Sequence, residues 1–213
     1  MAQRLKQEVR ERILAAAVQV YAEQGYGAAR LVDIADRAQV GTGNLYRYFK
    51  GKEALFNELV TPALAAELLR RLRRRMRELA DMKDWGRATV AGADGADALL
   101  EFWVEQREVV IILLSGAEGT RLAHVRSLVH SELSRQAGRY IRMQEERVGK
   151  EGTAALAPVP RFVLTQIFAG TIEMIIAILR QYREPKDIRE AFANFWRYQL
   201  HGLQALLTVS GEE

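Results

Sequence analysis

Hydrophobic residues recur at helical spacing along most of the chain. The first such stripe consists of Leu5, Val9, Ile13, Ala17 and Val20. Apolar residues three or four positions apart share one face of a helix, so this segment is predicted to form an amphipathic helix. Gly25 follows at a position where glycine commonly ends a helix, and we expect the first helix to stop there.

Similar patterns predict further helices over residues 31–38, 42–49, 52–79, 96–114, 120–148, 161–183 and 187–208. Pro62 lies inside the segment 52–79 and lacks a backbone N–H, which predicts a kink or a break there. Residues 85–95 contain three glycines and are predicted to form a loop, and the glycines and prolines of residues 149–160 indicate a linker. No segment alternates as a strand would. The predicted fold class is therefore all-α.

The composition rules out several kinds of functional site but does not identify one function. The 213 residues are 49% hydrophobic, enough for a sizeable core, and include no cysteine, which excludes disulfides, thiolate metal sites and cysteine nucleophiles. The net charge of +4 suits an anionic partner without requiring one. We see no secretory signal, and the most apolar stretch, residues 172–179, is far shorter than the roughly 20 residues of a membrane span. We expect a cytoplasmic protein without a membrane partner.

Residues 31–49 carry the most informative pattern. Two short predicted helices are separated by a tight turn at residues 39–41. The small Ala35 allows the helices to cross closely, and Val40 and Leu45 fill the angle between them. This arrangement is typical of a helix-turn-helix, which presents its second helix to the major groove of DNA.

The exposed face of that second helix has residue types suited to double-stranded DNA. Gly43 allows close approach of the backbone, and Asn44 can both donate to and accept from a base edge. The predicted DNA contacts are Thr42, Gly43, Asn44, Tyr46, Arg47, Tyr48 and Lys52. The hydroxyl and charged members of this set suit phosphate oxygens. Leu45 and Phe49 are expected to be core residues; the alternative for the polar ones is simple solvation.

The N-terminal sequence resembles the TetR family of bacterial regulators. The resemblance rests on residues 13–17 (ILAAA), 21–26 (YAEQGY), 33–38 (DIADRA) and 43–55 (GNLYRYFKGKEAL). It implies a three-helix helix-turn-helix domain, residues 1–51, followed by a larger helical ligand-binding and dimerisation domain, residues 52–213. It also implies a homodimer formed through the last two helices and, usually, repression that a small-molecule effector relieves.

Three positions depart from the family pattern. Gln39 occupies the turn position where glycine is common, so a left-handed residue there must carry a side chain. Ala29 and Arg30 replace the hydroxyl residue that caps the second helix, a cap worth about 1 kcal/mol. Gly41 stands where serine is common. These changes affect individual phosphate contacts rather than the predicted fold.

The C-terminal half offers architecture and only candidate chemistry. Residues 162–179 are apolar nearly all round, and a helix of this kind must be covered on more than one side. Packing of one side against a second copy gives a four-helix interface, from which we expect an inverted-repeat operator. The arginine-rich stretch 70–77 is interpreted as a solvated helix face, with attraction to DNA or to another anionic partner as alternatives.

An effector pocket is expected among the C-terminal helices. Candidate ligand-binding residues are Trp103, Glu118, His124, Phe162, Gln166 and Glu173. Glu173 is the strongest candidate of these. Burying a carboxylate inside an apolar helix is energetically unfavourable unless it is paired or solvated. Ligand binding is expected to move the helix after Pro62 and thereby change the separation of the two recognition helices.

Two other function classes compete with this interpretation. An enzyme is not expected, since the three histidines have no metal-ligand spacing and no nucleophile motif occurs, so neither a cofactor nor a metal is predicted. A helical binding module that has lost DNA binding is kept open by Gln39 and Gly41. The retained Gly43, Asn44, Tyr46 and Tyr48 argue against it.

Overall fold

The computed structural model describes residues 2–82, 94–151 and 159–207, and every regular element among them is helical. The chain divides into two compact units, which are described separately. The N-terminal unit comprises residues 1–67 and 106–126, and the C-terminal unit comprises residues 68–105 and 127–213. The first unit is therefore larger than the domain 1–51 expected from the sequence. The predicted loop 85–95 falls largely outside the described residues, as does most of the linker 149–160.

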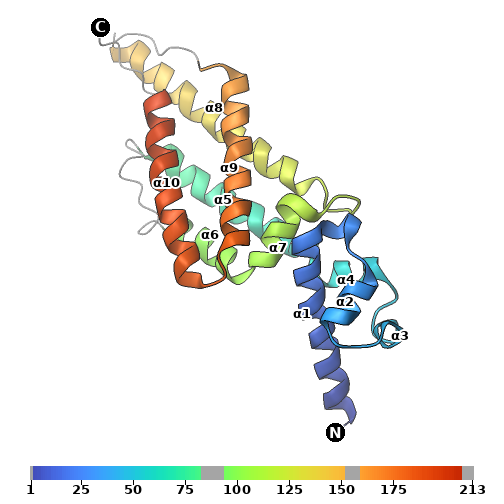
Figure 1. Ribbon diagram of the computed structural model, residues 1–213. Coiled ribbons are helices and arrows are strands. Elements are labelled where there is room, and N and C mark those ends of the chain that lie inside the picture. Colours follow the sequence, from blue (N-terminus) through green and yellow to red (C-terminus); the bar gives the residue numbers. More distant parts are fainter. Residues whose placement is uncertain (1, 83–93, 152–158, 208–213) are drawn as a thin grey trace. The chain divides into compact units, whose positions relative to one another are not determined.

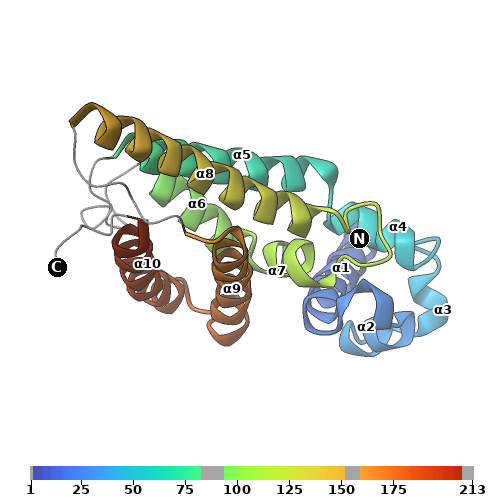
Figure 2. The same ribbon diagram turned by 90° about the horizontal axis from the view of Figure 1, so that it is seen from above.

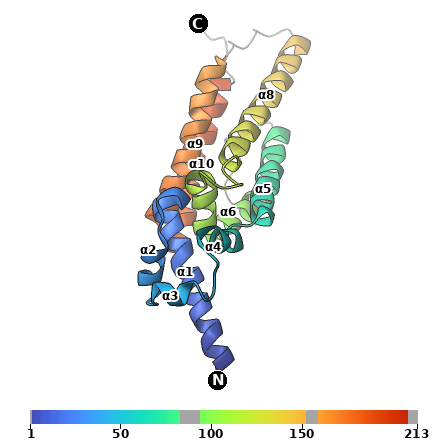
Figure 3. The ribbon, with the colours of Figure 1, turned by 90° about the vertical axis from the view of Figure 1, so that its right-hand side faces the viewer.

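The N-terminal unit is built around α1, Ala2–Ala28. Its buried positions include Ile13, Ala17, Val20 and Tyr21, as the apolar stripe predicts, whereas Leu5 is 63% exposed because it lies two turns before the first buried residue. Gly25 leaves the helical region with a φ of 77°, so the chain bends at the predicted position. Helices α2 (Leu31–Arg37) and α4 (Lys52–Leu59) pack against α1, and α3 (Thr42–Leu45) packs against α2 (Figure 3).

A later segment of the chain completes this unit. Helix α7, Arg107–Ile111, continues into a π-helical turn, Ile112–Gly116, and both pack against α1 (Figure 1). Gly116 approaches Gly25 so closely that a Cβ on Gly116 would lie 3.1 Å from the Gly25 Cα and 3.2 Å from the Tyr21 carbonyl oxygen. A side chain at position 116 would force these backbone atoms to move apart by a few tenths of an ångström.

The C-terminal unit contains the greater part of α5 (Pro62–Asp81) and α8 (Val125–Glu151), together with α6 (Asp94–Glu105), α9 (Arg161–Gln181) and α10 (Pro185–Leu207). The last two helices pack against each other, and α10 also packs against α6 (Figure 2). The predicted break at Pro62 is confirmed, because α4 ends at Leu59 and α5 begins at Pro62. Thr61 caps the new helix, accepting from Leu64 N at 3.3 Å.

Three predicted helix boundaries were wrong. The helix predicted over 42–49 ends as an α-helix at Leu45, because Arg47 N and Tyr48 N bond the carbonyls three residues back. The helix predicted over 96–114 breaks at Gln106, whose φ of −110° and ψ of 32° are non-helical. The helix predicted from residue 120 starts at Val125, after turns in which Thr120 Oγ1 bonds the Ala117 carbonyl at 2.7 Å.

The arginine-rich stretch of α5 is only partly a solvated face. Arg75 is buried, and burial lowers its pKa while the charge of Glu78 opposes that shift. Arg71 stacks over the Phe102 ring of α6 at 5.3 Å, and Arg73 reaches Glu132 of α8 at 3.1 Å. The solvated-face interpretation therefore holds for the exposed Arg70, Arg74 and Arg77 and fails for the buried Arg75. It is incomplete for Arg71 and for the exposed Arg73, which also contact neighbouring helices.

Helix α9 is apolar enough in length and composition to span a membrane, with a mean hydropathy of 2.0 over its best window. Seven of its residues are nevertheless buried within the C-terminal unit: Phe168, Thr171, Ile172, Ile175, Ile176, Ile178 and Leu179. The opposite side carries the exposed Phe162 and Met174. One helix of this composition is weak support for a membrane span, and a core helix of a soluble protein has the same character.

Candidate functional site

Two short helices and a tight turn form the predicted helix-turn-helix. The turn closes through hydrogen bonds from Ala38 N to Ile34 O at 2.9 Å and from Val40 N to Ala35 O at 3.0 Å. Gln39 adopts a φ of 55°, which confirms that this left-handed position carries a side chain. Leu45 of α3 is fully buried beside Ile34 and Ala35 of α2, so the apolar side chains fix the angle between the helices.

The start of α2 lacks the cap that a hydroxyl residue would supply. Arg30 occupies the N-cap position without a side-chain capping bond. Its guanidinium instead donates to both carboxylate oxygens of Asp33, at 2.7 and 3.1 Å, and these bonds lower the pKa of Asp33. Arg37, at the other end of α2, pairs with Glu23 of α1 at 2.7 Å. One charged pair thus lies at the uncapped start of α2, and a second joins its end to α1.

Six of the seven predicted DNA contacts lie together on α3 and the turn after it. Tyr46 is 56% exposed, Gly43 and Arg47 are also exposed, and Thr42, Asn44 and Tyr48 are half-buried. None of their side chains makes a hydrogen bond or an ion pair with any residue that the structure describes. Phe49 is 4% exposed and Leu45 fully buried, as expected for core residues. The polar groups of this face are thus available to an external partner.

Gly43 has no structural reason to be glycine. A Cβ built on this residue would meet no atom within 4 Å, and its φ is not in the left-handed region. Gly25 and Gly51, by contrast, have φ values of 77° and 148° that favour glycine. The fold would therefore accept a side chain at position 43.

Lys52 departs from the role expected for it. Its ammonium donates to the carbonyl oxygens of Tyr26, Gly27 and Ala29 at 2.6, 3.2 and 3.0 Å, and it lies 4.4 Å from the centre of the Tyr26 ring. These carbonyls stand at the end of α1, where a helix leaves acceptors unsatisfied and favours a cation. These bonds connect Lys52, at the start of α4, to the end of α1. Lys52 could contact a DNA phosphate only by giving up these hydrogen bonds.

Tyr21 of α1 also connects α1 to the start of α4. This fully buried side chain donates its hydroxyl to the Lys52 carbonyl oxygen at 3.0 Å. Burial, followed by the neighbouring Tyr26, raises the pKa of Tyr21 above its ordinary value, so the hydroxyl remains protonated and able to donate. Its ring packs edge-on against Phe56 of α4, with centroids 5.4 Å apart. The start of α4 is thereby fixed to the end of α1.

A pocket lies within the C-terminal unit, between α5, α8, α9 and α10. Its cavity volume is about 50 Å³, within a wider hollow of about 560 Å³ that includes open solvent. The lining residues are Met76, Leu79, Ala80, Leu133, Gln136, Ala137, Phe168, Thr171, Trp196, Gln199, Leu200 and Leu203. Apolar side chains with a few polar groups are typical of a small-molecule site.

The six predicted ligand-binding residues lie outside this lining. Trp103 is 3% exposed and stacks on Trp196, whose ring does line the pocket, with centroids 6.2 Å apart. The other five are exposed: Glu118 and His124 in the N-terminal unit, and Phe162, Gln166 and Glu173 on α9. Periodicity alone could not separate the exposed side of α9 from the side that meets the pocket.

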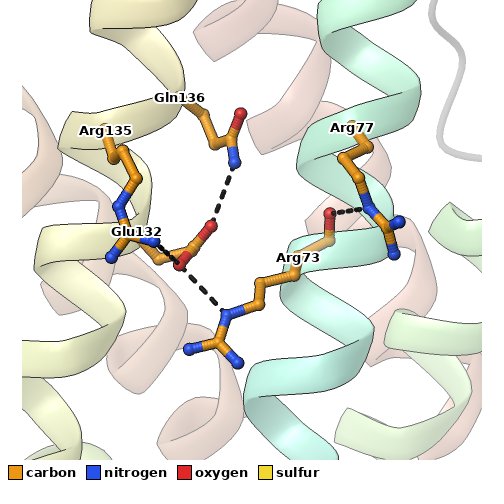
Figure 4. A network of polar contacts seen from close by, with 5 residues as sticks. All are labelled: Arg73, Arg77, Glu132, Arg135 and Gln136. Atoms are coloured by element: carbon orange, nitrogen blue, oxygen red, sulfur yellow. Dashed lines mark hydrogen bonds and ion pairs between the residues drawn. The ribbon is translucent and has the colours of Figure 1, made fainter.

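Sequence reasoning also missed the polar residues that the pocket does contain. Gln136 Nε2 donates to Glu132 Oε1 at 3.0 Å, and Gln199 Nε2 donates to Thr171 Oγ1 at 3.0 Å (Figure 4 shows the former). A usable signal was present, because Glu132 and Gln136 stand four residues apart beside the apolar Leu133 and Ala137. Polar residues bordering an apolar stripe at this spacing are often paired.

A comparison with known protein families identifies the N-terminal segment of the chain. The sequence profile of bacterial regulatory proteins of the tetR family matches residues 13–59, which span the end of α1 to the end of α4. Residues 13–59 form a DNA-binding domain of the tetR-family type. Its helix-turn-helix is accordingly a DNA-binding element, and the family is one of regulators rather than enzymes. A sequence comparison with curated proteins gave no match.

Three solved structures resemble this chain along nearly its whole length. The fatty acid degradation regulator FadR from Bacillus halodurans is 21% identical, with 95% of this chain and 99% of that chain covered and a TM-score of 0.45. FadR from Bacillus subtilis in complex with stearoyl-CoA is 18% identical, with 93% and 97% covered and a TM-score of 0.42. PfmR from Thermus thermophilus is 17% identical, with 96% and 97% covered and a TM-score of 0.43. TM-scores below 0.5 support no conclusion about ligand or operator.

Proposed function

We propose that this TetR-family regulator is a cytoplasmic, homodimeric repressor that binds an inverted-repeat operator and is released by a small-molecule effector. The observation that carries the DNA-reading part is the face formed by α3 and the following turn. Its polar side chains have no partner among the described residues, and Gly43 is glycine without a structural need. Two copies of such a face, related by a two-fold axis, match half-sites about one DNA turn apart, roughly 34–36 Å.

Each residue of this face has a proposed role. Asn44 reads a base edge, because its amide can donate and accept at once. Gly43 lets the α3 backbone approach the DNA, and Thr42, Tyr46, Arg47 and Tyr48 bind phosphate oxygens. Lys52 is left out of this set, since its ammonium holds the end of α1.

Selection from random duplexes tests the operator proposal. Purified protein is incubated with the library at about 150 mM salt, where nonspecific attraction is weakened, and the bound DNA is sequenced after several rounds. We expect an inverted repeat to be enriched, and Asn44→Ala and Tyr46→Ala to abolish the enrichment while leaving the helical content unchanged. An equal enrichment by the variants refutes the assignment of this face. A wild-type protein that selects nothing supports a binding module that has lost its DNA function.

The proposed dimer uses the exposed side of α9 and α10. Phe162, Gln166, Gly170 and Met174 follow one another at four-residue spacing on α9, and all are exposed. Phe162 is 72% and Met174 45% exposed, and a Cβ on Gly170 would meet nothing within 4 Å. On α10, Tyr198 is 77% exposed. An apolar stripe with a small residue at its centre suits close packing against a second copy.

Gly170→Arg tests this interface. The substitution adds bulk and charge to open space in the single chain, so we expect normal folding but a monomer in light scattering coupled to size exclusion. Operator affinity should fall as well, because the two half-sites would no longer be held together. Ala66→Arg, at an exposed position on α5, serves as the matched control. A dimeric Gly170→Arg protein would place the interface elsewhere.

The effector part of the proposal rests on the pocket of the C-terminal unit. Its wall includes Met76, Leu79 and Ala80 of α5, the helix that starts at Pro62. A ligand that prefers one position of α5 would shift the separation of the two recognition helices and weaken operator binding. Pro62 is the proposed hinge. If a Pro62→Ala protein releases operator at the same effector concentration as the wild type, Pro62 has no part in the response.

A further inference from the structure

Gln136 places an unpartnered acceptor in the pocket wall. The residue is 9% exposed, and its Oε1 is buried without a hydrogen-bond partner in the part of the chain that the structure describes. Figure 4 shows the amide nitrogen directed at Glu132 and the amide oxygen on the opposite side of the group. Leaving a buried acceptor without a partner is destabilising, so a bound molecule that donates a hydrogen bond to this oxygen would be stabilised.

The buried Glu132 determines which end of the Gln136 amide is left without a partner. Glu132 is 2% exposed and pairs with Arg73 at 3.1 Å and with Arg135 at 3.4 Å. Burial alone would raise its pKa, but the hydrogen bonds from Gln136 and Arg73 and the two arginine charges lower it. An ionised carboxylate only accepts hydrogen bonds, so the amide must turn its nitrogen to Glu132. A flipped amide would bring two acceptor oxygens together.

The second glutamine of the pocket is oriented in the same sense. Thr171 Oγ1 donates its single proton to the Ile167 carbonyl at 2.8 Å, and it therefore accepts from Gln199 Nε2 at 3.0 Å. The Gln199 amide oxygen is the atom left for other contacts. Among the described lining residues there is no charged side chain. The pocket therefore offers acceptor oxygens in an apolar wall, and a buried anion would lack any neutralising partner.

We propose that the pocket binds a neutral, mostly apolar molecule whose hydroxyl donates a hydrogen bond to Gln136 Oε1. This inference rests on the proposed effector site and specifies the chemistry of its ligand. Gln136 is the specificity-determining residue, and Glu132, held by Arg73 and Arg135, is a positioning residue. A ligand group that only accepts hydrogen bonds is disfavoured, because it would leave Gln136 Oε1 unpaired.

A matched pair of probes tests the inference by isothermal titration calorimetry on the full chain. The probes are 4-butylphenol and 4-butylanisole, which share the apolar part and differ in the hydroxyl proton. We expect the phenol to bind about tenfold more tightly to the wild type, the difference made by one buried hydrogen bond. Gln136→Met should bind both probes equally. Gln19→Met, at an exposed position on α1, should keep the wild-type preference.

A second variant keeps the test decisive if Gln136→Met does not fold. In Glu132→Gln the neighbouring amide can also donate, so Gln136 is free to turn over and the preference for the phenol should shrink severalfold. Equal affinity of the two probes for the wild type overturns the inference but leaves an apolar effector site standing. Failure of both probes to bind the wild type overturns the effector site together with the inference.

Discussion

The substitution Lys52→Met tests whether Lys52 stabilises the fold or binds a DNA phosphate. In the wild type the Lys52 ammonium bonds three carbonyl oxygens at the end of α1, two of them part-buried, and lies over the Tyr26 ring. A hydrogen bond to a charged group contributes about 1.5–3 kcal/mol, and an exposed cation–π contact about 0.5–1 kcal/mol. The exposed Gly27 carbonyl can be solvated by water after the substitution. We therefore expect the N-terminal unit to lose about 2–4 kcal/mol of its free energy of unfolding.

Urea denaturation followed by far-ultraviolet circular dichroism measures this loss. Tryptophan fluorescence is unsuitable, because the three tryptophans, at positions 85, 103 and 196, all lie outside the N-terminal unit. Lys50→Met is the matched control, since Lys50 is exposed and makes no contact with the described residues. It should leave the free energy of unfolding unchanged.

The phosphate-contact alternative gives a different pair of results. If Lys52 binds a phosphate, Lys52→Met should leave the free energy of unfolding within about 0.5 kcal/mol of the wild type. It should also reduce the slope of log affinity against log salt concentration by about 0.9, the value for one lost phosphate contact. That combination would refute the assignment of Lys52 to the junction of α1 and α4.

Three further predictions address the glycines and the buried carboxylate. Gly43→Ala should weaken operator binding by at least about tenfold, about 1.4 kcal/mol, in a mobility-shift assay without lowering the melting temperature, because a Cβ fits the folded chain. Gly116→Ala should lower the free energy of unfolding by about 1–3 kcal/mol, since its Cβ would meet backbone atoms, whereas Gly27→Ala, with nothing within 4 Å, should be neutral. The lowered pKa of Glu132 means that its contribution is complete above the ordinary value of 4.5 and is lost as the pH falls. Stability of Glu132→Gln should therefore decline less than that of the wild type between about pH 5 and pH 3.

The helix-turn-helix could be predicted because its determinants are local. Leu45 and Ile34 are buried as their spacing indicates, and Pro62 ends a helix through its own ring chemistry. Even the left-handed Gln39 was identified from its place in the turn. Each of these features depends on residues within about one helical turn, which a sequence displays directly.

The contents of the pocket depend on contacts that a sequence does not display. Arg73 and Glu132 are 59 residues apart, and Gln199 and Thr171 are 28 apart. Which side of α9 faces the pocket is decided by its packing in the C-terminal unit, so Phe168 lines it while Phe162 is exposed. The partners of Lys52 could not be predicted for the same reason, because its carbonyl partners lie 23 to 26 residues earlier.

Gly43 and Gln136 each lower the stability of the fold without a structural benefit, and each lies at one of the two proposed binding sites. Glycine in a helix is less favourable than alanine by up to about 1 kcal/mol, yet Gly43 has room for a side chain. An unpaired buried acceptor costs about 1–3 kcal/mol, yet Gln136, which lines the apolar pocket, holds one. Gly25 and Gly116, in contrast, satisfy a backbone need within the N-terminal unit. A sequence that breaks a local rule with no compensating contact in the fold is expected to gain that contact from a partner, and for Gly43 and Gln136 the partners are DNA and the effector.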